Sequence, residues 1–176
     1  MKSLIILIST IASSIGIDQL IKWLVRSNML VGQTIPVIDD IFHITYIRNE
    51  GAAFGILSEH RWVFMTFSTI AIIAIGVYLF KFCEEPLFTK IGLALIVGGG
   101  IGNMIDRIIL KYVVDMIDCR FIDFYIFNFA DCCVCVGSGM VILGLIHSLA
   151  KDIRRKRAKE IDAPDGEQEN NEDTGC

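Results

Sequence analysis

The chain has 176 residues, of which 53% are hydrophobic and only 20% are charged. A soluble globular domain carries about 25% charged residues, so this composition argues against a protein that water surrounds on all sides. The net charge is −4 and the sequence has a single short basic cluster, so it lacks the extended basic surface that nucleic-acid binding requires. We expect no nucleic-acid partner.

The first apolar segment predicts a membrane helix over about residues 3–25, interrupted by Asp18 and Lys22. Its basic start and the small residues of "ASSIG" also fit a cleavable signal peptide. However, no small-x-small site precedes a polar mature start, and hydrophobicity resumes after Asp18. This pattern favours a helix that is retained.

Beyond the first helix, the segment "TIPVIDDIFHITYIRN" is rich in β-branched and aromatic residues in partial alternation. It predicts a small β-subdomain over about residues 28–58. Apolar runs then predict three more membrane helices, each about as long as the 30 Å hydrocarbon thickness requires. Their expected bounds are about 62–80, 87–106 and 132–150. The predicted fold class is therefore a mainly α membrane protein with four transmembrane helices and an extracytoplasmic β-subdomain between the first two.

Basic residues beside the predicted helices indicate their orientation, because cytoplasmic loops are enriched in Lys and Arg. Lys2 precedes the first helix, Lys81 follows the second, and "KDIRRKRAKE" follows the fourth. Both termini are expected in the cytoplasm, with residues 26–61 and 106–131 outside. We expect one membrane-embedded domain over residues 1–159.

The last segment, residues 160–176, is acidic and without hydrophobic periodicity. It predicts a disordered cytoplasmic tail.

Two polar clusters come first along the chain. Asp18 and Lys22 are four residues apart, so they share one helix face and can form an ion pair. Spacing alone leaves a structural pair and a functional role equally open. In "RNEGAAFG", Asn49 offers amide donors and an acceptor, and Gly51 permits close approach of a backbone or ligand. An ordinary turn explains that motif as well.

The third cluster is "GGGIGNMIDRI", at the end of a predicted membrane helix. Its glycines favour close helix contact rather than dinucleotide binding, which requires a preceding strand. Asn103 and Asp106 lie on neighbouring positions of one helix face, and Arg107 follows. A structural ion pair and a part in a functional site are both compatible with this spacing.

The fourth cluster holds the aspartates before the last helix. Asp118 and Asp123 lie in the polar middle of the segment, where solvation of a loop explains them. Asp131 begins the last helix, where a carboxylate is favoured by the helix dipole and free N–H groups. If the intervening turn brings Asp115 back to Asp131, the two carboxylates can share a proton and activate water against a peptide bond. That chemistry requires no metal or cofactor.

A metal site is not expected from the six cysteines. Cys132, Cys133 and Cys135 lie in an apolar run without His or carboxylate at zinc-ligand spacing, so packing explains them. The S-x-x-K match "SLAK" lies at the cytoplasmic end without its companion motifs. We expect neither a metal nor a serine nucleophile.

Taken together, "DQLIK", "RNEGAAFG", "GGGIGNMIDR", "VVD" and "FNFAD" resemble the motifs of lipoprotein signal peptidases (signal peptidase II), which are bacterial membrane aspartyl peptidases. The resemblance implies that Asp115 and Asp131 form the catalytic dyad. It further implies a set of residues that bind substrate or support the site: Asp18, Lys22, Asn49, Gly51, Asn103, Asp106, Arg107, Asn128 and Ala130. Met116 departs from the family pattern, where an aromatic is expected, and so does the Cys132–Cys133 pair, where a small hydroxylated residue is common.

The resemblance also implies the reaction. The expected substrates are diacylglyceryl-modified prolipoproteins, cleaved before the lipidated cysteine, in the bacterial cytoplasmic (inner) membrane with the active site at its extracytoplasmic face. We expect a monomer that contacts membrane lipid. The rival hypothesis is a small ion or proton transporter that uses Asp18, Lys22, Asp106 and Asp131 as relay groups. The clustering of these charges near one face argues against a conduction path.

Overall fold

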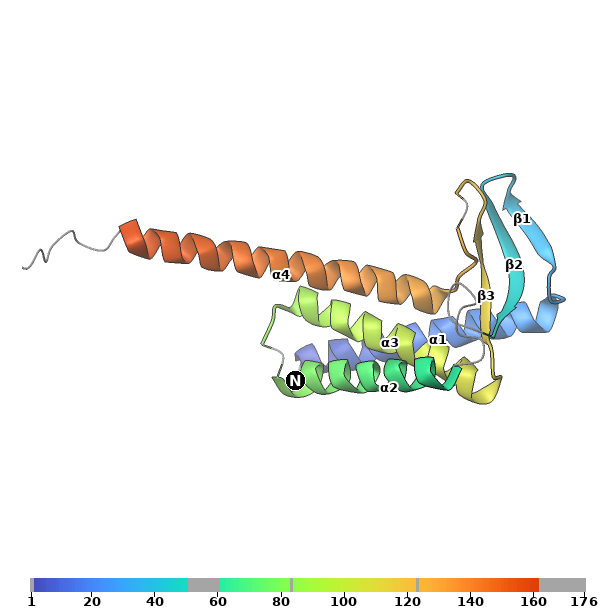
Figure 1. Ribbon diagram of the computed structural model, residues 1–176, viewed down its shortest axis with the longest axis horizontal. Helices are drawn as coiled ribbons and strands as arrows, with labels where there is room; N and C mark the ends of the chain where they lie inside the picture. The colour runs from blue at the N-terminus through green and yellow to red at the C-terminus, as the bar shows by residue number, and fades with distance from the viewer. Residues whose placement is uncertain (1, 51–60, 83, 123, 162–176) are drawn as a thin grey trace, which may run out of the picture. The chain divides into compact units, whose positions relative to one another are not determined.

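The computed structural model describes residues 2–50, 61–82, 84–122 and 124–161. Helices make up most of the described chain, with three short strands (Figure 1). In chain order the elements are α1 (Lys2–Asn28), β1 (Thr34–Ile38), β2 (Phe42–Asn49), α2 (Arg61–Val77), the π-helical turn η1 (Tyr78–Phe82), α3 (Leu87–Ile109), β3 (Val113–Cys119) and α4 (Phe129–Ile161).

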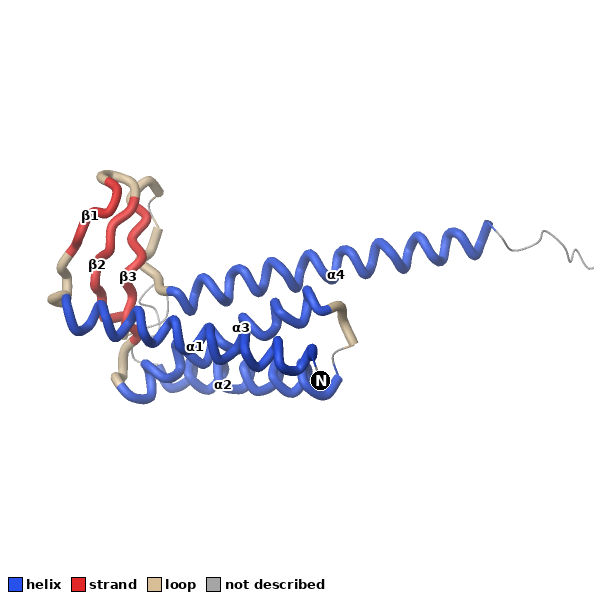
Figure 2. Tube along the Cα trace, turned by 180° about the vertical axis from the view of Figure 1, so that it is seen from behind, coloured by secondary structure: helices blue, strands red, loops and turns tan. Residues whose placement is uncertain are grey.

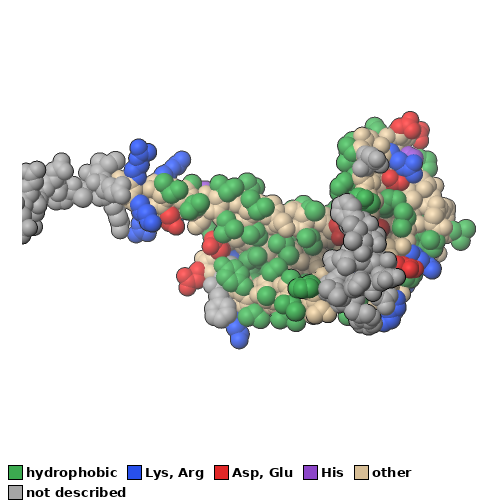
Figure 3. Space-filling view, viewed as in Figure 1, with side chains coloured by type: hydrophobic (Ala, Val, Ile, Leu, Met, Phe, Trp, Pro, Cys, Tyr) green, Lys and Arg blue, Asp and Glu red, His purple; other side chains and the backbone are tan. Residues whose placement is uncertain are grey.

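Three of the described helices are long and apolar enough to cross a membrane: α1, α3 and the Phe129–Ala158 part of α4. The apolar helical stretch Met65–Lys81, from α2 into η1, is shorter. The prediction of a mainly helical membrane protein is confirmed at this level. Hydrophobic side chains cover much of the visible helical surface in Figure 3, as expected of helices whose solvent is lipid.

Small residues let α3 approach its neighbours closely. A Cβ on Gly98 would lie 2.8 Å from the Cβ of Ser14 in α1. A Cβ on Gly92 would lie 2.8 Å from the carbonyl oxygen of Gly137 in α4. Without a hydrophobic force between helices in lipid, such close contact supplies the packing energy. The glycines of α3 therefore bring the polar residues near its C-terminal end close to α1 and to the first part of α4.

The three strands form one antiparallel sheet in the order β1–β2–β3. The predicted β-subdomain over residues 28–58 was incomplete, because β3 comes from the segment between α3 and α4. In the β2–β3 register, Asn49 lies opposite Val113 and Ile47 opposite Asp115, with an irregularity between Ile44 and Ile47. The tube in Figure 2 shows the three strands side by side.

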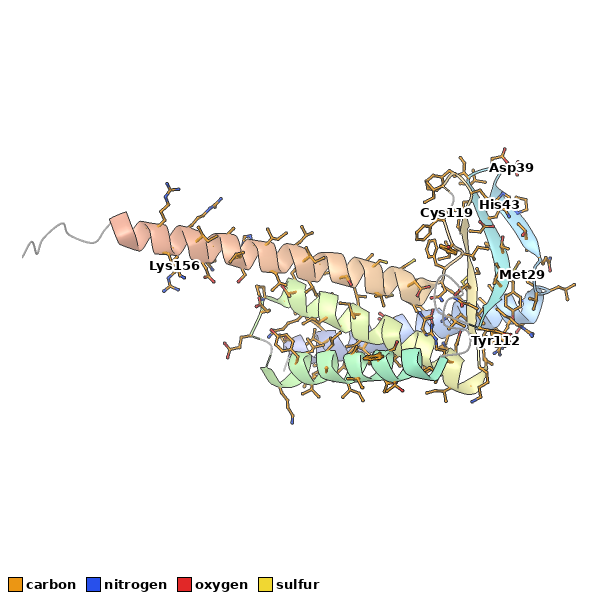
Figure 4. The ribbon with its side chains drawn as sticks, in the orientation of Figure 1. Met29, Asp39, His43, Tyr112, Cys119 and Lys156 are labelled. Carbon is orange, nitrogen blue, oxygen red and sulfur yellow. The ribbon has the colours of Figure 1, made fainter. Side chains whose placement is uncertain are left out.

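One face of the sheet encloses a small core beside the end of α1. Val25, Tyr46, Val114 and Met116 are its buried members. Figure 4 places Tyr112, which packs against this core, where β3 begins. Met116 fills core space here, so its position does not require the aromatic residue expected from the family pattern.

Residues up to Gly144 form one compact unit, and Leu145 begins a second. In this second unit α4 continues as an exposed helix with basic side chains, including Lys156, labelled in Figure 4. The predicted disordered tail, residues 160–176, falls almost wholly outside the described residues, since α4 extends through Ile161.

Candidate active site

The predicted site residues that the structure describes lie in one connected network. They come from α1, β2, α3, β3 and the start of α4, and they are Asp18, Lys22, Asn49, Asn103, Asp106, Arg107, Asp115, Asn128, Ala130 and Asp131. The remaining predicted residue, Gly51, lies outside the described residues.

Lys22 is a buried cation of this network. Its Nζ lies 2.9 Å from Asp18 Oδ2 and 3.3 Å from Asp106 Oδ2. The same ammonium donates to Asn103 Oδ1 at 2.8 Å. Lys22 and both carboxylates are buried, so each charge depends on its partners rather than on water. The predicted pair of Asp18 and Lys22 is thus part of a buried cluster and not an exposed interfacial pair.

The two carboxylates of this cluster also hold backbone groups of other elements. Asp18 Oδ1 accepts a hydrogen bond of 3.0 Å from the N–H of Ala130, in the first turn of α4. Asp106 Oδ2 accepts one of 3.0 Å from the N–H of Val114 in β3. The buried cluster therefore fixes the two segments that carry Asp131 and Asp115.

The start of α4 forms a capping box that includes Asp131. Asn128 is the N-cap, and its Oδ1 accepts from the N–H of Asp131 at 3.1 Å. Reciprocally, Asp131 Oδ2 accepts from the N–H of Asn128 at 3.1 Å. Helix starts leave several N–H groups without helical partners, and these bonds satisfy them. The helix-capping explanation of Asp131 is correct, but it accounts for one carboxylate oxygen only.

The other oxygen of Asp131 faces α3. Asn103 Nδ2 donates to Asp131 Oδ1 at 2.8 Å, while Asn103 Oδ1 accepts from both Lys22 and the Nδ2 of Asn128. Arg107 donates through Nη1 to the carbonyl oxygen of Asn103 at 3.3 Å, which holds this turn of α3. Asn103 therefore connects the buried ion cluster to Asp131.

Asp115 is the more enclosed of the two aspartates, with 2% of its surface exposed, whereas Asp131 is half-buried. Asn128 Nδ2 donates to Asp115 Oδ1 at 2.6 Å, and Asn49 Nδ2 donates to Oδ2 at 2.9 Å. Burial raises the pKa of Asp115 to about 6; the two amide hydrogen bonds oppose this rise, and the nearby charge of Asp131 adds to it.

One residue of the network was missed from the sequence. Gln19 Nε2 donates to the carbonyl oxygen of Gly102 at 3.1 Å and to Asp106 Oδ1 at 3.0 Å. It also lies 3.2 Å from Asp18 Oδ2. Gln19 stands within the "DQLIK" motif, but its partners in α3 are more than eighty positions away in the chain, so spacing within α1 gave no signal for them.

Asp118 corrects a prediction. It was expected to solvate a loop, but it is buried within β3. Its Oδ2 accepts from Thr45 Oγ1 at 2.6 Å and from Arg120 Nε at 2.9 Å. Burial would raise the pKa of Asp118, but these hydrogen bonds and the Arg120 charge outweigh it and lower the pKa. Asp118 supports the sheet, and Asp123 lies outside the described residues.

Within the described ranges, no group of three or more His, Cys, Asp or Glu side chains could hold a metal ion. Cys119, Cys132, Cys133 and Cys135 are free thiols, and Cys133 is buried among the helices. The side chains of the network are carboxylates, amides, a lysine and an arginine.

Apolar helices that enclose a network of buried carboxylates and amides define a membrane protein with a polar site between its helices and its sheet. Comparison with known proteins is more specific. Residues 10–147 match the family model of signal peptidase (SPase) II, and the chain belongs to this family.

Two relatives illustrate the similarity. The lipoprotein signal peptidase of Clostridioides difficile (strain 630) is 43% identical over 124 residues, which are 70% of this chain and 83% of the relative. That of Bacillus subtilis (strain 168) is 42% identical over 145 residues, or 81% and 92% of the two chains. A solved bacterial membrane enzyme, determined by the in meso method at 2.3 Å resolution, matches with a TM-score of 0.77 and 33% identity. That match covers 82% of this chain and 90% of the solved one.

Proposed function

We propose that the chain is an aspartic endopeptidase that removes the signal peptide from diacylglyceryl-modified prolipoproteins, cleaving before the lipidated cysteine. Family membership supports the substrate class. The single observation that carries the mechanism is the side chain of Asn128, which donates to Asp115 through Nδ2 and accepts from the backbone of Asp131 through Oδ1. One amide thus contacts the carboxylate of Asp115 and the backbone of Asp131, and this supports a dyad in which the two carboxylates share a proton.

In this mechanism Asp131 is the base and Asp115 the acid. Asp115 is the more deeply buried group, and its pKa of about 6 lets it keep a proton in mildly acidic to near-neutral conditions. Asp131 is half-buried, and its carboxylate accepts hydrogen bonds from the Asn103 side chain and from the backbone N–H of Asn128. In the proposed mechanism this more exposed carboxylate accepts the proton from water. The two aspartates thereby take opposite roles because their surroundings differ.

The bond changes follow from these roles. Asp131 removes a proton from water as the water oxygen bonds to the scissile carbonyl carbon, while the Asp115 proton hydrogen-bonds to the carbonyl oxygen. Collapse of the tetrahedral intermediate breaks the C–N bond. A dyad proton passes to the leaving nitrogen, which becomes the amino terminus of the lipidated cysteine. The signal peptide leaves with a new carboxylate, so the reaction is a hydrolysis without a covalent enzyme intermediate.

The membrane setting fits a lipidated substrate. We propose four transmembrane helices, because α2 and η1 together cover Arg61–Phe82, a helical length of about 30 Å. Both termini then lie in the cytoplasm, and the sheet and the dyad lie at the extracytoplasmic face of the bacterial inner membrane. A substrate anchored by its diacylglyceryl group reaches this level by lateral diffusion. We propose that one copy of the chain suffices.

The test uses purified full-length protein in lipid vesicles, with a diacylglyceryl-modified prolipoprotein and the same prolipoprotein without the lipid. We expect cleavage of the modified protein only, with a lipidated cysteine at the new amino terminus by mass spectrometry. No cleavage, or cleavage at another bond, would refute the proposed function. Ion flux through the same vesicles without proteolysis would favour the transporter instead.

A further inference from the structure

A groove of about 300 Å³ lies between the C-terminal parts of α1 and α3. Trp23 and Arg26 line it from α1, and Ile105 and Ile109 line it from α3. Asp115 and Asp131 are not among its lining residues. Figure 2 shows α1 running toward the strands at this end of the helices. The groove therefore borders the buried ion cluster through Lys22 and Asp106 but does not include the two aspartates of the proposed dyad.

The apolar wall of the groove is open to the surroundings of the protein. Trp23 is 55% exposed and Ile109 is 69% exposed. Since α1 and α3 are both able to cross a membrane, these side chains meet lipid rather than water. An acyl chain can lie along this wall.

The polar side of the groove contains two kinds of group. Lys22 and Asp106 reach it, but both are buried and contact each other at 3.3 Å. Arg26 is exposed, and among the described residues it forms no salt bridge with a carboxylate; the Tyr112 hydroxyl lies close enough to interact with its charge. The cation that remains for a ligand is therefore the guanidinium of Arg26, which suits a phosphate group.

The position of this guanidinium along α1 matches the headgroup level of a bilayer. At 1.5 Å per residue, Trp23 lies about 32 Å from the start of α1 at Lys2, close to the thickness of the hydrocarbon layer. Tryptophan is enriched at this boundary. Arg26, one turn further along, then lies among lipid phosphates.

We propose that the groove binds an anionic phospholipid, with its phosphate on Arg26 and an acyl chain along Trp23 and Ile109. The charge of the lining residues favours an anion, since Arg26 is a cation in addition to the ion pair of Lys22 and Asp106. A diacylglyceryl cysteine carries no phosphate, so its ester carbonyls offer the guanidinium hydrogen-bond acceptors but no negative charge. The charge of the groove therefore favours a membrane phospholipid over the uncharged lipid group of the substrate.

Fluorescence quenching tests this site directly, because the chain has two tryptophans. Replacing Trp62 by Phe leaves Trp23 as the only reporter. The full-length variant is placed in bilayers that contain a small, equal mole fraction of phosphatidylglycerol or phosphatidylcholine with brominated acyl chains, and quenching of Trp23 is measured. We expect phosphatidylglycerol to associate about fivefold more strongly, as one cation near an anionic headgroup contributes about 1 kcal/mol.

Two further variants decide the role of Arg26. In the same background, Arg26→Gln should abolish the preference for the anionic lipid, whereas Lys81→Gln, which removes an exposed cation elsewhere, should retain it. Equal quenching by both lipids in the parent would overturn the proposal. So would a preference that survives Arg26→Gln or disappears in Lys81→Gln.

Discussion

The substitution Asn49→Ala tests the assignment of Asp115 as the acid. Asn49 Nδ2 donates to Asp115 Oδ2 at 2.9 Å, and this bond stabilises the ionised carboxylate. Removing the donor must raise the pKa of Asp115 above its value of about 6. If Asp115 acts as the acid, activity is lost as pH rises through that pKa. The alkaline limb of the pH profile should therefore move upward.

The size of the shift follows from the geometry. A hydrogen bond to a charged group contributes about 1.5–3 kcal/mol, and 1.36 kcal/mol corresponds to one pKa unit. Asn49 is half-buried, so water replaces part of the lost bond. We expect the midpoint of the alkaline limb to rise by about one pH unit, at the lower end of that range.

The assay is kcat/KM for cleavage of a diacylglyceryl-modified prolipoprotein between pH 4 and 9. Thr45→Val is the matched control, because it removes a hydrogen bond to a different carboxylate of the same sheet, that of Asp118. The control should keep the wild-type midpoint. A midpoint that stays in place or falls in Asn49→Ala would refute the assignment of Asp115 as the acid.

Three further predictions concern stability, measured as thermal unfolding in detergent. Asp115→Asn should stabilise the protein by about 1–3 kcal/mol at pH 7 and by much less at pH 4. The folded state binds the Asp115 proton more tightly than the unfolded state, so the wild type loses stability as pH rises from about 4 to 6. Equal effects at both pH values would contradict this reasoning. Gly102→Ala should lower the free energy of unfolding by about 1–3 kcal/mol, since its Cβ would lie 2.6 Å from the buried Asp18 Oδ2. Gly139→Ala should be nearly neutral, because a Cβ there would meet nothing within 4 Å. Equal costs would be inconsistent with the packing. Lys22→Met should lower the free energy of unfolding by about 3–5 kcal/mol, because it leaves two buried carboxylates without their cation. Lys81→Met, which removes an exposed cation, is the control. A loss as small as that of the control would show that water solvates the carboxylates of the cluster.

The apolar helices and the motif residues of the site could be predicted from the sequence because their signals are local. An uncharged run of about 20 residues predicts a membrane helix wherever it occurs. Asp18 and Lys22 share a helix face through their spacing alone, and the structure has this ion pair. "FNFAD" has an N-cap residue three positions before an acid, the pattern of a capping box, and Asn128 and Asp131 form one.

The third strand could not be predicted in the same way, because its evidence lies in another segment. The two aspartates in "VVDMIDC" resemble loop residues until β2 supplies the partners of this strand. Asp118 illustrates this dependence: it is buried through a bond to Thr45, which is 73 positions away in the chain. The preference of a segment for strand depends on its packing against cross-strand neighbours, and for β3 these neighbours lie in a distant segment.

The same limitation applies to the links within the site. Asn103 reaches Asp131, and Asn128 reaches Asp115, across elements that the sequence does not show to be neighbours. The motifs identified which residues to consider, and the fold determines which atoms contact.

The most direct test of the central claim is the cleavage rate of a diacylglyceryl-modified prolipoprotein by purified Asp115→Asn and Asp131→Asn variants. Asp118→Asn is the control, because it alters a buried aspartate of the same strand that contacts Thr45 and Arg120 instead of the network. We predict that each of the first two variants loses cleavage while remaining folded, and that Asp118→Asn still cleaves. Cleavage at a near wild-type rate by Asp115→Asn or Asp131→Asn would contradict the dyad mechanism.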